Sequence, residues 1–215
     1  MLFWLALALA AVPADDERPG MVGHFEAATY TMLTTAVGDV RRARKHAQEL
    51  SERESIPMAI RIEATQLSKC NDMECAGDAI GSLARTCAEC HVAGGVGPQP
   101  TGVERLPLLP PQKQHAHAAM YMWIGLVTPH EKAFEVGLQG AVPPVDLDSS
   151  QALFDQLQAF EALVESTSKL TSWDDRADAF GDMLGTCAGC HELAGLDRRI
   201  KAEQKLAEKR AKQGE

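Results

Sequence analysis

Aromatic residues are scarce in this 215-residue chain, at 5% of the sequence, and residues with a strong preference for strands are nowhere clustered. Ala and Leu are abundant instead, which predicts an all-α fold of one domain or two small ones. The net charge is −9, so neither nucleic acid nor an anionic membrane surface is an expected partner. A basic protein partner is compatible with this charge.

No apolar run is long enough to span a bilayer, and the longest lies at the start of the chain. Residues 1–14 read MLFWLALALAAVPA, without any Lys or Arg, and an acidic stretch follows at once. We interpret them as an export signal cleaved near Ala14, so that Asp15 begins the mature chain. A buried N-terminal helix or an uncleaved anchor is the alternative. Export predicts a periplasmic protein with no transmembrane segment in its mature form.

A five-residue pattern, C-x-x-C-H, occurs twice with a spacing of 100 residues. It reads CAECH at 87–91 and CAGCH at 187–191. A weaker echo pairs HFEAATY, which begins at His24, with HAHAAMY, which begins at His115. The chain therefore contains two copies of one unit.

Between the copies, residues 94–112 are rich in Gly and Pro and predict a linker. This divides the chain into a first domain at 15–93, a second at 113–195 and a charged tail at 196–215. We expect four helices in each domain, arranged as two tandem four-helix-bundle-like units.

Local signals mark the expected helices. In the first copy, Gly38 ends a helix from Met21 to Val37, Asp39 caps the second, Pro57 opens the third, and the fourth reaches Cys90. In the second copy, the first helix ends at Leu126, Thr128-Pro129 starts the next, and Asp148 and Ser172 cap the third and fourth. The apolar stripe of each fourth helix continues into the first Cys and the His of its motif.

Two thiols at positions i and i+3 of a helix point the same way, which suits bonding to the two vinyl groups of one haem. The following His can then bind the iron, and this is the c-type haem attachment pattern. A thioredoxin-like dithiol requires a strand–helix context that is absent, a zinc site lacks a fourth ligand, and plain disulfides leave the repeated His unexplained. We therefore predict two covalent haems, which agrees with export because such attachment takes place outside the cytoplasm. The thioether residues are Cys87, Cys90, Cys187 and Cys190, and the proximal iron ligands are His91 and His191.

The second axial ligand should come from the start of each first helix, because in an up-down-up-down bundle that point and the end of helix four lie together. His24 and His115 occupy these positions and are the predicted distal ligands. His117 competes with His115, and several Met residues lie close in sequence. His46 and His130 have no repeat partner and are expected at the surface.

Cys70 and Cys75 stand in SKCNDMECA, which has no following His and no counterpart in the second copy. We predict a small-loop disulfide between them, with a metal site as the minor alternative.

The motif stretches LARTCAECH and MLGTCAGCH, near the end of each last helix, resemble the cytochrome c′ and cytochrome c-556 group of four-helix-bundle haem proteins. The resemblance implies electron transfer or the binding of small gases. A His at the start of helix one departs from that group and favours two six-coordinate haems. We therefore expect a one-electron carrier between periplasmic redox proteins, not an enzyme. A haem-based gas-binding or sensor protein with an open distal site is the alternative, and a peroxidase-like enzyme would require an added acid–base group.

Overall fold

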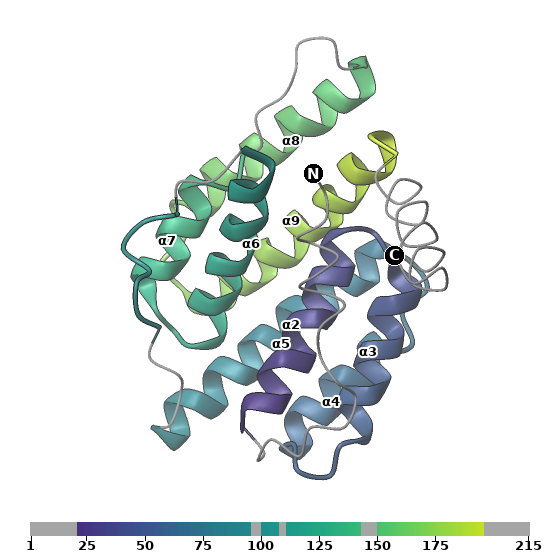
Figure 1. The fold of residues 1–215 in the computed structure, drawn as a ribbon, viewed down its shortest axis with the longest axis vertical. Coiled ribbons are helices and arrows are strands. Elements are labelled where there is room, and N and C mark those ends of the chain that lie inside the picture. Colours follow the sequence, from purple (N-terminus) through teal and green to yellow (C-terminus); the bar gives the residue numbers. More distant parts are fainter. Residues whose placement is uncertain (1–20, 96–99, 108–110, 143–149, 196–215) are drawn as a thin grey trace, which may run out of the picture.

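The computed structural model describes residues 21–95, 100–107, 111–142 and 150–195, and every regular element within these ranges is a helix (Figure 1). The first half contains α2 (Met21–Ala36), α3 (Val40–Glu52), α4 (Met58–Leu67) and α5 (Met73–Gly94). The second half contains α6 (Pro111–Val127), α7 (Glu131–Gln139), α8 (Gln151–Thr167) and α9 (Trp173–Leu193). The predicted all-α class is confirmed. The proposed export signal and the charged tail lie outside the described residues, and none of the described helices is long and apolar enough to cross a membrane.

Several helix ends follow the expected signals. Gly38 adopts a φ of +81° directly after α2, a conformation that favours glycine, and the Asp39 side chain accepts a hydrogen bond from the Arg42 backbone N–H at the start of α3. Ser172 caps α9 in the same way, by accepting from the Asp175 backbone N–H. α5 continues four residues past Cys90, to Gly94, and Gly95 ends it with a φ of +60°.

Two helix starts differ from expectation. The Thr128 hydroxyl donates to the Ile124 carbonyl inside α6 and is therefore not the cap of α7. His130 takes that role, because its Nδ1 accepts from the Ala133 backbone N–H, and α7 begins at Glu131. The cap of α8 is Ser150; Asp148, the expected cap, lies outside the described residues.

The closest contact between the two halves of the chain is made by α5 and α9. These two helices cross in the N-terminal part of each. A Cβ atom at Gly77 would lie 2.5 Å from the Gly181 carbonyl oxygen, and one at Gly81 would lie 2.6 Å from that of Ala177. Because the later contact on α5, at Gly81, meets the earlier position on α9, at Ala177, the two helices run antiparallel. The absence of side chains at these glycines is what allows the two backbones to touch.

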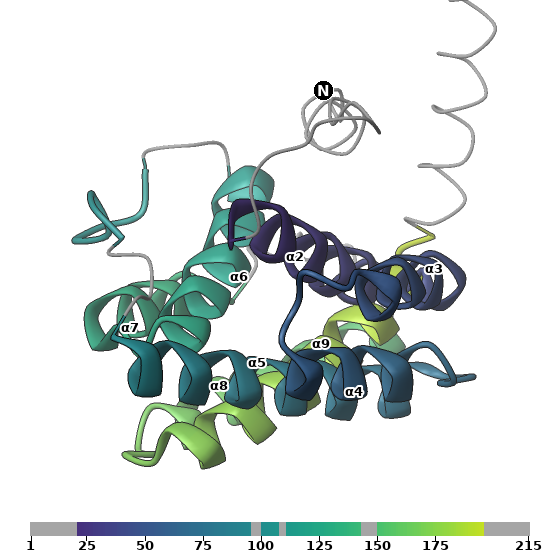
Figure 2. The ribbon, with the colours of Figure 1, turned by 90° about the horizontal axis from the view of Figure 1, so that it is seen from below.

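Both first helices, α2 and α6, lie on one side of the α5–α9 pair (Figure 2). Each of them packs on its own following helix, and each also contacts the last helix of the other half. Buried Trp123 on α6 stacks on Phe180 of α9 and donates from Nε1 to the Thr29 hydroxyl of α2 at 3.0 Å. The buried apolar side chains of both halves form one continuous core.

Candidate haem-binding sites

In the first half, the structure brings His24 and His91 together. His24 lies in the second turn of α2 and His91 near the end of α5, and both side chains are buried. Their ring centroids are 6.4 Å apart, with 35° between the ring planes. We name this pair, with Cys87 and Cys90, site 1.

The second half repeats this arrangement. His115 lies near the start of α6 and His191 near the end of α9, and both are half-buried. Their ring centroids are again 6.4 Å apart, but the planes are nearly perpendicular, at 84°. We name this pair, with Cys187 and Cys190, site 2.

Three of these four imidazoles are oriented by backbone carbonyls. The Nδ1 of His91 lies 2.5 Å from the Val127 carbonyl oxygen, that of His191 lies 2.8 Å from Ala36, and that of His115 lies 2.6 Å from Ala141. A carbonyl can only accept, so each Nδ1 carries a proton, and in the neutral form of such a ring the lone pair is on Nε2. This is the tautomer and the outer contact typical of a metal-binding His.

Burial also keeps the histidines of site 2 neutral. Desolvation lowers the pKa of His115, against the opposing effect of its hydrogen bond to Ala141. Desolvation likewise lowers the pKa of His191, with a further contribution from His115 beside it. Both imidazoles are therefore available as ligands at neutral pH.

The four motif cysteines are free thiols, and each motif lies within an unbroken helix. Burial, followed by the effect of the neighbouring motif Cys, raises the pKa of Cys87 and of Cys187 to about 12. A redox dithiol requires the opposite shift, because its thiolate is the reactive form. These thiols are poorly suited to disulfide exchange.

The separation of the paired imidazoles fits a single metal ion held between them. An imidazole nitrogen lies about 1.1 Å from its ring centroid and metal–nitrogen bonds of histidine are about 2.0–2.1 Å, so two axial imidazoles have centroids about 6.3 Å apart. Among the described residues there is no group of three or more His, Cys, Asp or Glu side chains that would hold a bare ion. Each site thus combines two facing imidazoles with two free thiols, which is the donor set that the c-type haem expectation requires.

The Sγ atoms of Cys70 and Cys75 are bonded, and their Cα atoms are 5.4 Å apart. This disulfide joins the loop after α4 to the first turn of α5, where the Asp72 side chain accepts from the Cys75 N–H. It fixes the start of the helix whose far end carries site 1.

The remaining predicted positions are outside both pairs. His46 contacts Tyr30 and Glu49, and His130 caps α7. The carbonyls of Ala36, Val127 and Ala141 are the part of the sites that sequence reasoning missed, since no side-chain pattern marks a backbone acceptor.

Comparisons of this chain with protein-family models, curated proteins and solved structures find no match. Its function is therefore inferred from the residues of sites 1 and 2.

Proposed function

We propose that this chain is an exported c-type cytochrome with two haems, built from two tandem four-helix units, that transfers single electrons between periplasmic redox partners. One observation carries the proposal. Each C-x-x-C-H histidine has a second histidine at the same 6.4 Å ring separation, contributed in both halves by the first helix.

The residues that would hold the two haems follow from this pairing. Cys87 and Cys90 would form the thioethers at site 1, with His91 and His24 as axial ligands. Cys187 and Cys190 would do so at site 2, with His191 and His115. When bound, such a haem supplies an iron that cycles between two oxidation states.

The protein's own groups suit a carrier of electrons. The Nδ1 protons of three ligands are already held by carbonyls, so a change of iron charge requires no proton transfer at these rings. The ligands lie on helices packed into one core, which limits structural change between the two states.

The paired imidazoles also favour a carrier over the alternative of a gas-binding or sensor protein. A gas ligand or peroxide requires an open coordination position. As axial ligands, His24 and His115 would fill that position, and His24 is only 6% exposed. The same argument disfavours a peroxidase-like enzyme.

The test is an optical spectrum of the matured protein, oxidised and then reduced with dithionite, followed by exposure to carbon monoxide. We expect two covalent haems per chain with sharp low-spin bands that carbon monoxide leaves unchanged. A large carbon monoxide shift would replace the carrier by gas binding, sensing or catalysis. Absence of covalent haem would reject the proposal altogether.

A further inference from the structure

Each proximal histidine is hydrogen-bonded to the first helix of the opposite half. His91, in the first half, donates to Val127, the last residue of α6. His191, in the second half, donates to Ala36, the last residue of α2. Each of these first helices also carries, near its other end, the candidate distal ligand of its own half. α2 and α6 therefore both contact site 1 and site 2.

The acceptors are carbonyls that a helix end leaves without an intrahelical partner. At the end of α2, the Gly38 N–H donates to the Thr35 carbonyl and the Asp39 N–H to that of Thr34, which leaves the Ala36 carbonyl for His191. At the end of α6, the Thr128 and His130 N–H groups donate to Ile124 and Gly125, which leaves the Val127 carbonyl for His91.

Such a carbonyl is an effective acceptor, because the negative end of the helix dipole lies there. A hydrogen bond from Nδ1 to it makes the imidazole a stronger donor through Nε2 and fixes the ring orientation. A stronger donor stabilises the oxidised iron and lowers the reduction potential.

We infer that the ends of α2 and α6 are positioning elements for the haem site of the opposite half, so that the two sites are structurally interdependent. This inference rests on the proposed function. It predicts that a change at the end of α2, in the first half of the chain, alters the haem attached at site 2 in the second half. The haem attached at site 1, in the same half as the change, should be unaffected.

Gly38→Ala is the test variant. Gly38 adopts a φ of +81°, which strains an alanine, while the added methyl group would meet Ala188 only at an ordinary 3.7 Å. The substitution should therefore shift the end of α2 and weaken the bond from His191 to Ala36. Each haem is examined alone, in the Cys87→Ser/Cys90→Ser background for site 2 and in the Cys187→Ser/Cys190→Ser background for site 1.

We expect Gly38→Ala to raise the reduction potential of the site 2 haem, changing its oxidation equilibrium about tenfold, the lower end of outer-contact effects. The site 1 haem should keep its potential. Gly38→Asn should give a smaller shift in the same direction, because asparagine tolerates positive φ. It also provides the measurement if the alanine variant does not accumulate.

Gly102→Ala is the matched control, with a φ of +72° and open space around the new methyl group. An unchanged site 2 haem in both Gly38 variants, or an equal shift in Gly102→Ala, would overturn the inference. If the wild-type chain carries two low-spin haems, that result leaves the proposed function intact. If the wild-type chain carries no haem, the proposed function is rejected, and the inference is rejected with it.

Discussion

At the scale of single residues, His24 and His115 decide whether the two sites are closed. Replacing either with Ala should leave one haem five-coordinate, because no other imidazole would remain opposite the motif histidine. We expect each variant to show a high-spin component and a carbon monoxide shift in half of its haem. The measurement is the reduced optical spectrum before and after carbon monoxide.

His117→Ala is the matched control for His115→Ala, since it removes an exposed imidazole from the same helix, two residues away. Its spectrum should equal that of the wild type. The assignment of His115 would be wrong if His117→Ala opened the site and His115→Ala did not.

The orientation of the rings provides a second prediction. The planes at site 1 differ by 35°, and those at site 2 by 84°. Two iron d orbitals overlap with the π systems of the axial imidazoles. Nearly parallel imidazole planes make the energies of these two orbitals different, whereas perpendicular planes leave the two energies nearly equal. Electron paramagnetic resonance of the oxidised protein should therefore resolve two low-spin signals, with larger anisotropy at site 2. In the Cys187→Ser/Cys190→Ser variant only the less anisotropic signal should remain, and two identical signals in the wild type would contradict the prediction.

The sequence already singles out all eight side chains of the two sites, because the spacing of the repeat relates His24 to His115 and each C-x-x-C-H to the other. It does not reveal the acceptors of the ring protons, since Ala36 and Val127 contribute only their carbonyls. It also predicts the wrong cap for α7, because the Thr128 hydroxyl has a competing acceptor within α6.

At the scale of elements, the crossing of α5 and α9 depends on glycine. A Cβ at Gly181 would lie 2.7 Å from the Gly77 carbonyl oxygen, so Gly181→Ala requires the two backbones to separate. We expect destabilisation by about 1–3 kcal/mol, the usual cost of overpacking. Urea unfolding followed by far-UV circular dichroism measures this change.

Gly185→Ala is the matched control, one turn later on the same helix, where a Cβ would meet nothing within 4 Å. It should stabilise the protein by about 0.5–1 kcal/mol, because alanine favours the helix. Equal effects of the two substitutions would show that helix propensity, and not close packing, governs these positions.

The spacing of Gly77 and Gly81, four residues apart on one face, is the sequence signal for this contact.

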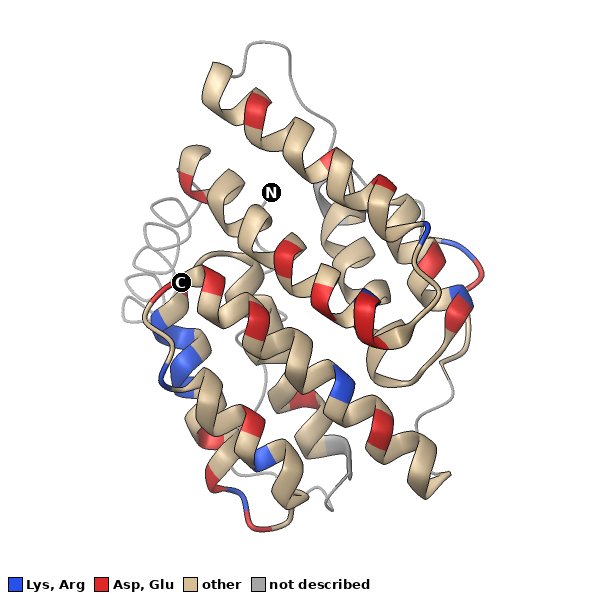
Figure 3. Cartoon of the chain, turned by 180° about the vertical axis from the view of Figure 1, so that it is seen from behind, with Lys and Arg blue, Asp and Glu red and all other residues tan. Residues whose placement is uncertain are grey.

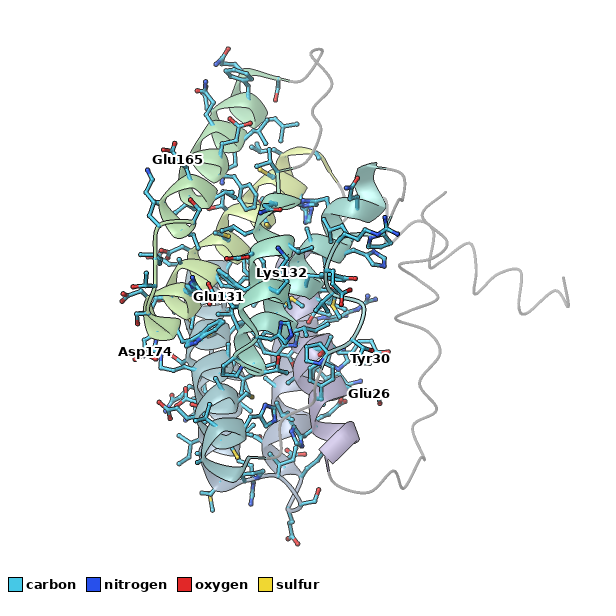
Figure 4. All side chains as sticks on the ribbon, turned by 90° about the vertical axis from the view of Figure 1, so that its left-hand side faces the viewer. Glu26, Tyr30, Glu131, Lys132, Glu165 and Asp174 are labelled. Carbon is cyan, nitrogen blue, oxygen red and sulfur yellow. A yellow bond between two sulfur atoms is a disulfide. The ribbon has the colours of Figure 1, made fainter. Side chains whose placement is uncertain are left out.

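A second element contact joins α7 to α9 through Glu131 and Arg176. Arg176 is buried, lies over the rings of both Phe134 and Trp173, and donates to both carboxylate oxygens of Glu131 at 2.6 and 2.7 Å. Figure 4 labels Glu131 on α7, close to the start of α9 at Asp174. The Arg176 hydrogen bonds hold the pKa of Glu131 below its ordinary value of 4.5.

This lowered pKa gives the pair a pH dependence. A carboxylate with a lowered pKa in the folded state stabilises the fold above pH 4.5, and its contribution is lost as pH falls through the folded pKa. Glu131→Gln should therefore cost about 1 kcal/mol at neutral pH, discounted because the Glu131 side chain is 55% exposed, and almost nothing below its folded pKa. Urea unfolding of both proteins at several pH values tests this.

Glu165→Gln is the control, because it removes an exposed partner of Lys169, and it should have little effect at any pH. An effect of Glu131→Gln that is independent of pH would refute the ionic explanation.

At the scale of the whole molecule, acidic residues are spread over most of the helices seen in Figure 3, whereas basic residues gather on α3 at one edge. The two sites lie toward opposite ends of the crossed α5–α9 pair. His91 is ten residues beyond Gly81 and His191 is ten residues beyond Gly181, in opposite directions from the crossing. Because Gly81 lies against Ala177, 24 residues separate the two histidines along the pair, which is at most about 36 Å at about 1.5 Å per residue and less where the helices cross at an angle.

This separation predicts two haems that titrate independently. Two unit charges about 30 Å apart interact by about 0.1 kcal/mol in water and by about 0.6 kcal/mol at the effective dielectric of a protein, and salt screens them further. The wild-type redox titration should therefore equal the sum of two one-electron curves, each reproduced by one single-haem variant. Because electron tunnelling falls exponentially with distance, exchange between the haems of one chain should also be slow. After a flash that reduces a small fraction of the haem, redistribution between the two signals should depend on protein concentration. A fast phase that is independent of concentration would contradict the prediction and would mean that electrons pass directly between the sites, for which α2 offers the shorter route, about 18 Å from His24 to Ala36.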